Sequence, residues 1–185
     1  MITRYKKYLD FLDSKLHKMF DSQRPFIKCK SGCSYCCEEG EYPLSELEFI
    51  WLMMGYEGLD QDTKDKVDAN IQELISKPRQ KMYKCPFLID KKCSVYNNRA
   101  IICRTFGLIS YDSTGKKKVP FCVDKELNYA EVFDKESSKI VSLAPDGTEP
   151  VAFNIDREFL TNKEFEKEFK IFFGDDKTLY DWLKE

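Results

Sequence analysis

Eight cysteines are the residues of this sequence most able to do chemistry. Four of them lie within nine residues at the spacing C-x3-C-x2-C-C, namely Cys29, Cys33, Cys36 and Cys37. The remaining four are spread over the next part of the chain, at Cys85, Cys93, Cys103 and Cys122. Thiolates two or three residues apart can converge on one metal, because the turn between them directs both sulfurs inward. The pattern therefore predicts that these eight thiols are metal ligands.

Disulfides and simple packing are the competing explanations for the cysteines. The chain has 185 residues, of which 42% are hydrophobic, so its core does not need disulfides to be stable. We find no signal-peptide pattern at the N-terminus and no apolar run long enough to span a bilayer. We therefore expect a cytoplasmic protein without membrane association, whose thiols stay reduced and available to metal.

The number of metal centres stays open at this point. Cys36 and Cys37 are adjacent, and we expect neighbouring side chains to point in different directions. Such a pair would serve two centres, or one polynuclear centre, more easily than a single ion. The count permits two four-thiolate sites, one site with spare thiols, or a larger cluster. His17 is the only histidine and falls on the polar side of a predicted helix, so we expect no histidine ligand.

Charge and motifs exclude several other function classes. Lysine and arginine number 30 against 32 acidic residues, which gives a formal charge of −2 and no reason to expect nucleic acid as a partner. The sequence has no G-x-G-x-x-G, no phosphate-binding loop and no acid–base constellation. A protein partner remains open.

Hydrophobic periodicity predicts a mainly α-helical chain with a small irregular and β-hairpin region. The Ser45 and Glu48 pattern is typical of a capping box at the start of a helix. The cysteines would form a metal-organised core wrapped by helices, and residues 29–37 and 85–122 would have to meet in space. The predicted elements are a helix at 2–20, an irregular segment at 26–41, helices at 45–55 and 62–76, a hairpin at 83–97, a helix at 98–106, strands at 118–122 and 151–155, and helices at 156–173 and 177–184.

The cysteine motifs resemble those of the YkgJ-type cysteine-cluster family. The resemblance rests on four runs in the same order: Cys33-Ser34-Tyr35-Cys36-Cys37, Cys85-Pro86-Phe87-Leu88, Cys93-Ser94-Val95-Tyr96-Asn97-Asn98-Arg99 and Cys103-Arg104-Thr105-Phe106. It covers about residues 29–125. Two departures are Ala100, where the family usually has proline, and the first x3 spacing, where x2 is common. We therefore divide the chain into an N-terminal helix (1–28), a cysteine-cluster metal-binding domain (29–125) and a C-terminal helical extension (126–185).

The resemblance implies a zinc- or iron-chelating domain, and members of the family are often labelled as iron–sulfur proteins. We expect a 4Fe-4S cluster, with zinc as the alternative, in a structural or electron-transfer role. Arg99 and Arg104 would support the cofactor through hydrogen bonds to sulfur or backbone, although surface salt bridges would explain both residues equally well. A zinc-stabilised interaction module is the second possible function.

An enzyme is the third possible function, because the domain also looks like that of flagellin lysine methylases, which implies methyl transfer to a protein lysine. The spacing from Cys29 to Cys36 additionally resembles the radical S-adenosylmethionine motif. Those enzymes need a long run of alternating strands and helices after the motif. Only 149 of the 185 residues follow Cys36, and they contain a second set of cysteines instead.

Overall fold

The computed structural model describes residues 1–30 and 32–185. Ser31, which belongs to the segment predicted to be irregular, lies outside the described residues. The chain forms two compact units, each built from two stretches of sequence. The first unit comprises Met1–Ser31 and Thr105–Ile171, and the second comprises Gly32–Arg104 and Phe172–Glu185. Both units therefore cut across the predicted domain ranges, whose boundaries stay a prediction.

The first unit combines the long N-terminal helix with short elements from the second half of the chain. Its sheet has the strand order β5-β4-β8, with β4 antiparallel to β5 and parallel to β8. Its elements are α1 (Ile2–Ser22), η1 (Arg24–Phe26), β4 (Ile109–Tyr111), β5 (Lys117–Lys118), η3 (Phe121–Lys125), η4 (Ala130–Val132), β6 (Phe133–Asp134), β7 (Lys139–Ile140), β8 (Ala152–Phe153), α6 (Arg157–Leu160) and α7 (Lys163–Phe169).

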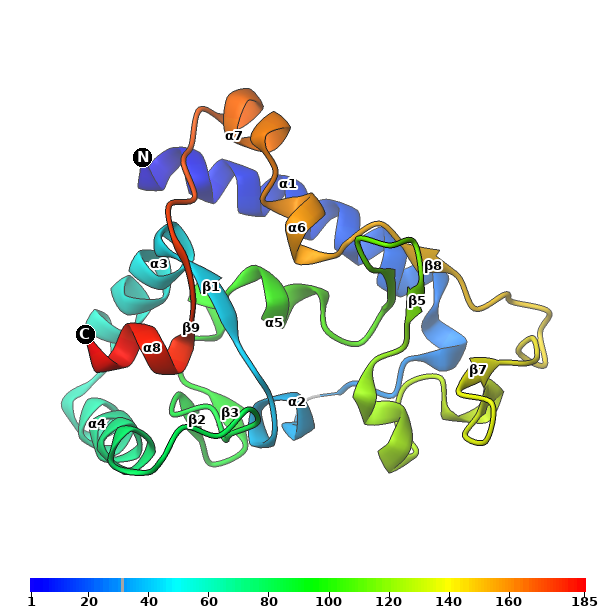
Figure 1. The fold of residues 1–185 in the computed structure, drawn as a ribbon, viewed down its shortest axis with the longest axis horizontal. Coiled ribbons are helices and arrows are strands. Elements are labelled where there is room, and N and C mark those ends of the chain that lie inside the picture. Colours follow the sequence, from blue (N-terminus) through cyan, green and yellow to red (C-terminus); the bar gives the residue numbers. More distant parts are fainter. Residues whose placement is uncertain (31) are drawn as a thin grey trace. The chain divides into compact units, whose positions relative to one another are not determined.

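The second unit contains most of the cysteines and closes on the C-terminus of the chain. Strand β1 pairs in antiparallel register with β9, so that Leu44 lies opposite Lys177, and the two strands run side by side in Figure 1. Its elements are α2 (Tyr35–Glu38), β1 (Pro43–Ser45), α3 (Glu46–Glu57), α4 (Gln61–Ser76), β2 (Leu88–Ile89), β3 (Lys92–Cys93), η2 (Tyr96–Asn98), α5 (Ile101–Thr105, ending at the unit boundary), β9 (Asp176–Thr178) and α8 (Leu179–Lys184).

Helix α3 begins with the predicted capping box. The Ser45 hydroxyl accepts a hydrogen bond from the Glu48 N–H, and the Glu48 carboxylate accepts bonds from the Ser45 N–H at 2.9 Å and the Ser45 hydroxyl at 2.8 Å. The other oxygen of this carboxylate accepts the N–H of Ile101 at 2.9 Å. Glu48 is fully buried, so its charge is stabilised by these donors. One side chain therefore fixes the starts of both α3 and α5.

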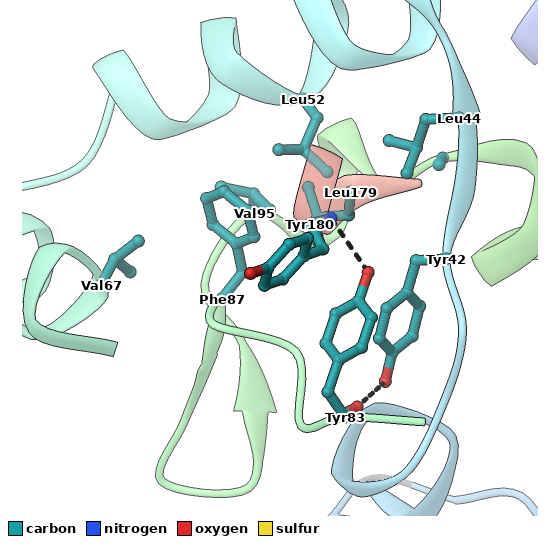
Figure 2. Close-up of a cluster of buried hydrophobic side chains, with 10 residues drawn as sticks. Tyr42, Leu44, Leu52, Val67, Tyr83, Phe87, Val95, Leu179 and Tyr180 are labelled. Carbon is teal, nitrogen blue, oxygen red and sulfur yellow. Dashed lines mark hydrogen bonds between the residues drawn. The ribbon is translucent and has the colours of Figure 1, made fainter. Parts of the chain in front are cut away.

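Tyrosine, leucine and other large side chains, not cysteines, fill the core of the second unit (Figure 2). The Tyr83 hydroxyl accepts the N–H of Tyr180, and the rings of Tyr42 and Tyr83 meet edge to face at 5.3 Å. Cys85, Cys93 and Cys103 are only partly buried and pack against this core from outside. The helix-rich fold is therefore as predicted, whereas the expectation of a cysteine-rich core is not confirmed. The buried residues of this core cluster are Tyr42, Leu44, Leu52, Val67, Tyr83, Phe87, Val95, Ala100, Leu179 and Tyr180.

Several predicted elements differ from the structure. The helix expected at 156–173 is two helices, because the Asn162 side chain caps a new helix by accepting from the N–H groups of Glu164 and Phe165. The strand expected at 118–122 is wrong beyond Lys118, since Pro120 starts a 3-10 helix there. Within residues 1–30 and 32–185, none of the helices combines the length and apolar character that a bilayer span requires.

The Glu48 carboxylate gives a test of this fold. Substitution Glu48→Gln replaces one acceptor oxygen by an amide N–H group, which then faces a buried donor. We expect the free energy of unfolding to fall by about 2–3 kcal/mol. Urea denaturation followed by circular dichroism measures this change. Glu57→Gln is the matched control, because Glu57 forms an exposed ion pair with Lys64 and should change stability by no more than about 0.5 kcal/mol.

Candidate metal centre

The structure divides the eight predicted ligands between the two units. Cys29 and Cys122 belong to the first unit, and the other six belong to the second. The six are Cys33, Cys36, Cys37, Cys85, Cys93 and Cys103. Cys33 is exposed, whereas the other five are partly buried. These five thiols are therefore the donors to consider together.

Backbone hydrogen bonds join the first cysteine segment to the segment that contains Cys85. The Cys85 N–H donates to the Cys37 carbonyl at 2.8 Å. Beside this bond, Gly40 and Tyr83 form an antiparallel bridge, with N···O distances of 3.1 and 3.0 Å. The prediction that these distant stretches meet in space is confirmed for the part that lies in the second unit.

The sulfurs of Cys36 and Cys37 lie 3.9 Å apart. Both residues belong to the single turn of α2, and their thiols are close enough for one to donate to the other. The expectation that these neighbouring side chains diverge is therefore wrong. The successive residues of one helical turn are separated by about 100° around the axis, so flexible thiols can still turn toward each other. The pair can present both sulfurs to one centre.

A tight hairpin and a short helix place Cys93 and Cys103. Strands β2 and β3 pair Leu88 with Cys93, and the turn between them has positive φ at Asp90 and Lys91. This hairpin is the one predicted at 83–97. Cys103 lies on α5, whose first N–H group is held by Glu48. Rigid backbone elements therefore position both thiols.

Burial and mutual charge raise the pKa values of four thiols, Cys36, Cys85, Cys93 and Cys103. The hydrogen bond with Cys37 and burial raise the pKa of Cys36, while burial raises the pKa of Cys85 well above its usual range. Burial also raises the pKa of Cys103 to about 12. Removing several thiol protons here without a cation would be costly, because the thiolates repel one another. A bound metal ion would supply the missing positive charge.

Two arginines lie beside these thiols. The positive charge of Arg99 lowers the pKa values of Cys93 and Cys103, opposing the effect of burial. Its guanidinium lies 3.9 Å from the centre of the Tyr96 ring. Arg104 is buried and donates to the carbonyls of Arg99 at 3.0 Å and Asn97 at 2.9 Å. These bonds hold the backbone between Cys93 and Cys103, and a direct role toward a cofactor stays a prediction.

Tyr42 contributes to this site, although the cysteine pattern gave no signal for it. Its hydroxyl donates to the Cys36 carbonyl at 3.0 Å and approaches the Tyr83 carbonyl at 3.4 Å. Burial, followed by the charges of Cys85 and the other nearby thiols, raises the pKa of Tyr42. Tyr42 therefore links the core to α2.

Among the aromatic residues near cysteines in sequence, Phe87 is buried in the core and Tyr96 is largely exposed.

In the first unit, Cys29 lies beside a buried amide. The Asn128 side chain donates to the Cys29 sulfur at 3.2 Å and to the Gly107 carbonyl at 2.9 Å, and accepts from the Lys28 N–H at 2.7 Å. Gly107 has φ +109°, and a Cβ there would lie 2.8 Å from the Asn128 amide nitrogen. Within the first unit, Cys29 therefore contacts the Asn128 amide, and Cys122 is buried.

The donor set is not closed in this structure. Within residues 1–30 and 32–185, no three histidine, cysteine, aspartate or glutamate side chains have converged to hold a metal ion. The thiols nevertheless fit a thiolate-bound metal by donor type and neighbourhood. Cys36, Cys37, Cys85, Cys93 and Cys103 would hold such a group.

Comparison with known proteins identifies the family. The family named CxxCxxCC, described as "Putative zinc- or iron-chelating domain", matches residues 28–130. The chain belongs to this family. No curated protein and no solved structure matches the chain significantly. All eight cysteines and both arginines fall inside the CxxCxxCC match, which confirms the suspected family and supports metal binding by this part of the chain.

Tyr42→Phe tests how the core supports the CxxCxxCC domain. The substitution removes the hydroxyl that donates to the Cys36 carbonyl and keeps the buried ring. We expect the free energy of unfolding to fall by about 1 kcal/mol, measured by urea denaturation. Tyr96→Phe is the control, because Tyr96 is 60% exposed and should change little. Equal stability of Tyr42→Phe and the unsubstituted protein would contradict this role.

Proposed function

We propose that this chain is a metal-binding protein whose thiolates hold an iron–sulfur centre. One observation carries the proposal: the hydrogen bond from the Cys85 N–H to the Cys37 carbonyl joins the two cysteine segments within one unit. Cys37 and Cys85 lie at this junction, and Cys85, Cys93 and Cys103 pack against the adjoining core. Thiolates in such numbers are typical ligands of iron–sulfur clusters and of zinc.

A structural or electron-transfer role follows from the donor type. A centre held entirely by thiolates has no open position for substrate, so it would connect segments of the chain or carry an electron. The surrounding residues would hold the thiols in place and compensate part of their charge. Arg99 supplies positive charge beside Cys93 and Cys103, and Arg104 fixes the backbone between them.

The choice of iron–sulfur over a single zinc ion follows from the resemblance to the YkgJ-type family, whose members are often labelled as iron–sulfur proteins. The number of thiols does not decide it, because a structural zinc site and a 4Fe-4S cluster both take four cysteines. The Cys36 and Cys37 sulfurs lie 3.9 Å apart, so either can supply the fourth thiolate of such a centre. A reducing cytoplasm, where we place the protein, would keep all these thiols available.

Metal and sulfide analysis after anaerobic purification tests the proposed function. We expect iron together with acid-labile sulfide, and a brown protein with visible absorption, because sulfide-bridged iron absorbs visible light. Zinc without sulfide would replace the iron–sulfur assignment by a zinc-stabilised interaction module. A protein carrying neither metal, with free or disulfide-bonded thiols, would contradict metal binding.

Removal of the metal should loosen the region between the two cysteine segments. The Gly40–Tyr83 bridge closes a loop that contains α3 and α4, and metal bound at its base adds its binding energy to folding. We expect faster amide hydrogen exchange in residues 46–76 after chelation, with little change in α1. Unchanged exchange and an unchanged melting curve would contradict this coupling.

A further inference from the structure

We propose that Cys85, Cys93 and Cys103 form one centre together with the Cys36–Cys37 pair, and that this centre is complete without Cys29 and Cys122. The inference rests on the proposed metal-binding function and deepens it. Cys85, Cys93 and Cys103 would each supply one thiolate, and either Cys36 or Cys37 would supply the fourth. The sequence alone left two sites, one site with spare thiols and a larger cluster equally open.

Shared packing is the first argument. The side chains of Cys85, Cys93 and Cys103 all pack against the same buried cluster, although they come from a loop, a hairpin strand and a helix. Three separate elements therefore present their cysteines to one core. Cys29 and Cys122 belong to the first unit.

Backbone and side-chain hydrogen bonds add the Cys36–Cys37 pair to this region. The Cys37 carbonyl accepts from the Cys85 N–H, and the Cys36 carbonyl accepts from Tyr42, which belongs to the same core. The pair is therefore attached both to Cys85 and to the cluster against which the other thiols pack. Its two sulfurs, 3.9 Å apart, lie together.

The hairpin joins Cys85 to Cys93. The Leu88 N–H donates to the Cys85 carbonyl at 3.1 Å, and Leu88 lies opposite Cys93 in the pairing of β2 with β3. Leu88 therefore contacts the backbone of both cysteines, which places them close together.

Cys29 and Cys122 instead share surroundings within the first unit. The charges of both raise the pKa of Tyr129, after the larger effect of burial. The Asn128 amide already donates to the Cys29 sulfur. These effects associate Cys29 and Cys122 with residues of the first unit, to which both belong.

Substitution of individual cysteines, and of Cys36 and Cys37 together, tests which thiols hold the metal. We expect Cys85→Ser, Cys93→Ser, Cys103→Ser and the double variant Cys36→Ser/Cys37→Ser each to lose at least about tenfold in bound iron or zinc per chain after anaerobic purification, as removal of a ligand would cause. Cys29→Ser and Cys122→Ala should keep the metal content and visible spectrum of the unsubstituted protein. Circular dichroism checks that each variant is folded.

Chemical labelling gives a readout that does not depend on variants folding. The unsubstituted protein, metal-loaded or treated with chelator, is labelled with N-ethylmaleimide and its peptides are analysed by mass spectrometry. Loading should protect Cys85, Cys93 and Cys103 and leave exposed Cys29 equally reactive. Metal loss in Cys29→Ser, or protection of Cys29 on loading, would overturn the division while leaving metal binding intact. Absence of metal from the unsubstituted protein would instead refute the proposed function.

Discussion

The pairing of two short backbone segments is the constraint on which the rest of this structure depends. Gly40 and Tyr83 exchange hydrogen bonds, and the Cys85 N–H donates to the Cys37 carbonyl next to them. Closing a loop of this length costs conformational entropy, which grows only slowly with the number of residues. The tyrosine-rich core recovers that cost, because Tyr42 and Tyr83 flank the pairing and bury their rings against each other.

The same region balances several negative groups at the edge of an apolar core. Glu48 is buried, and its charge is met by N–H and hydroxyl donors at the starts of two helices. Its charge also raises the pKa of Cys103, whereas Arg99 lowers it. A metal centre here would therefore join a charge arrangement that already contains a fixed anion and a nearby cation. The aromatic core would keep its thiolates away from bulk water on one side.

Local signals in the sequence predicted much of this arrangement. The capping box at Ser45, the hairpin around Asp90 and the first helix are all determined by residues close together in the chain. The pairing of β1 with β9 was not predicted, because it joins short strands more than a hundred residues apart. The break at Asn162 was also missed, since a helix-compatible pattern continues on both sides of this single capping residue.

The cysteine pattern identified the family and the donor type but not how the thiols are grouped. Grouping depends on tertiary packing, and Tyr42, which links the core to Cys36, carries no cysteine-like signal in the sequence. X-ray absorption at the edge of the bound metal tests the central claim most directly. A first shell composed of sulfur alone is the predicted result. A first shell dominated by nitrogen and oxygen would contradict a centre held by the thiolates of these two segments.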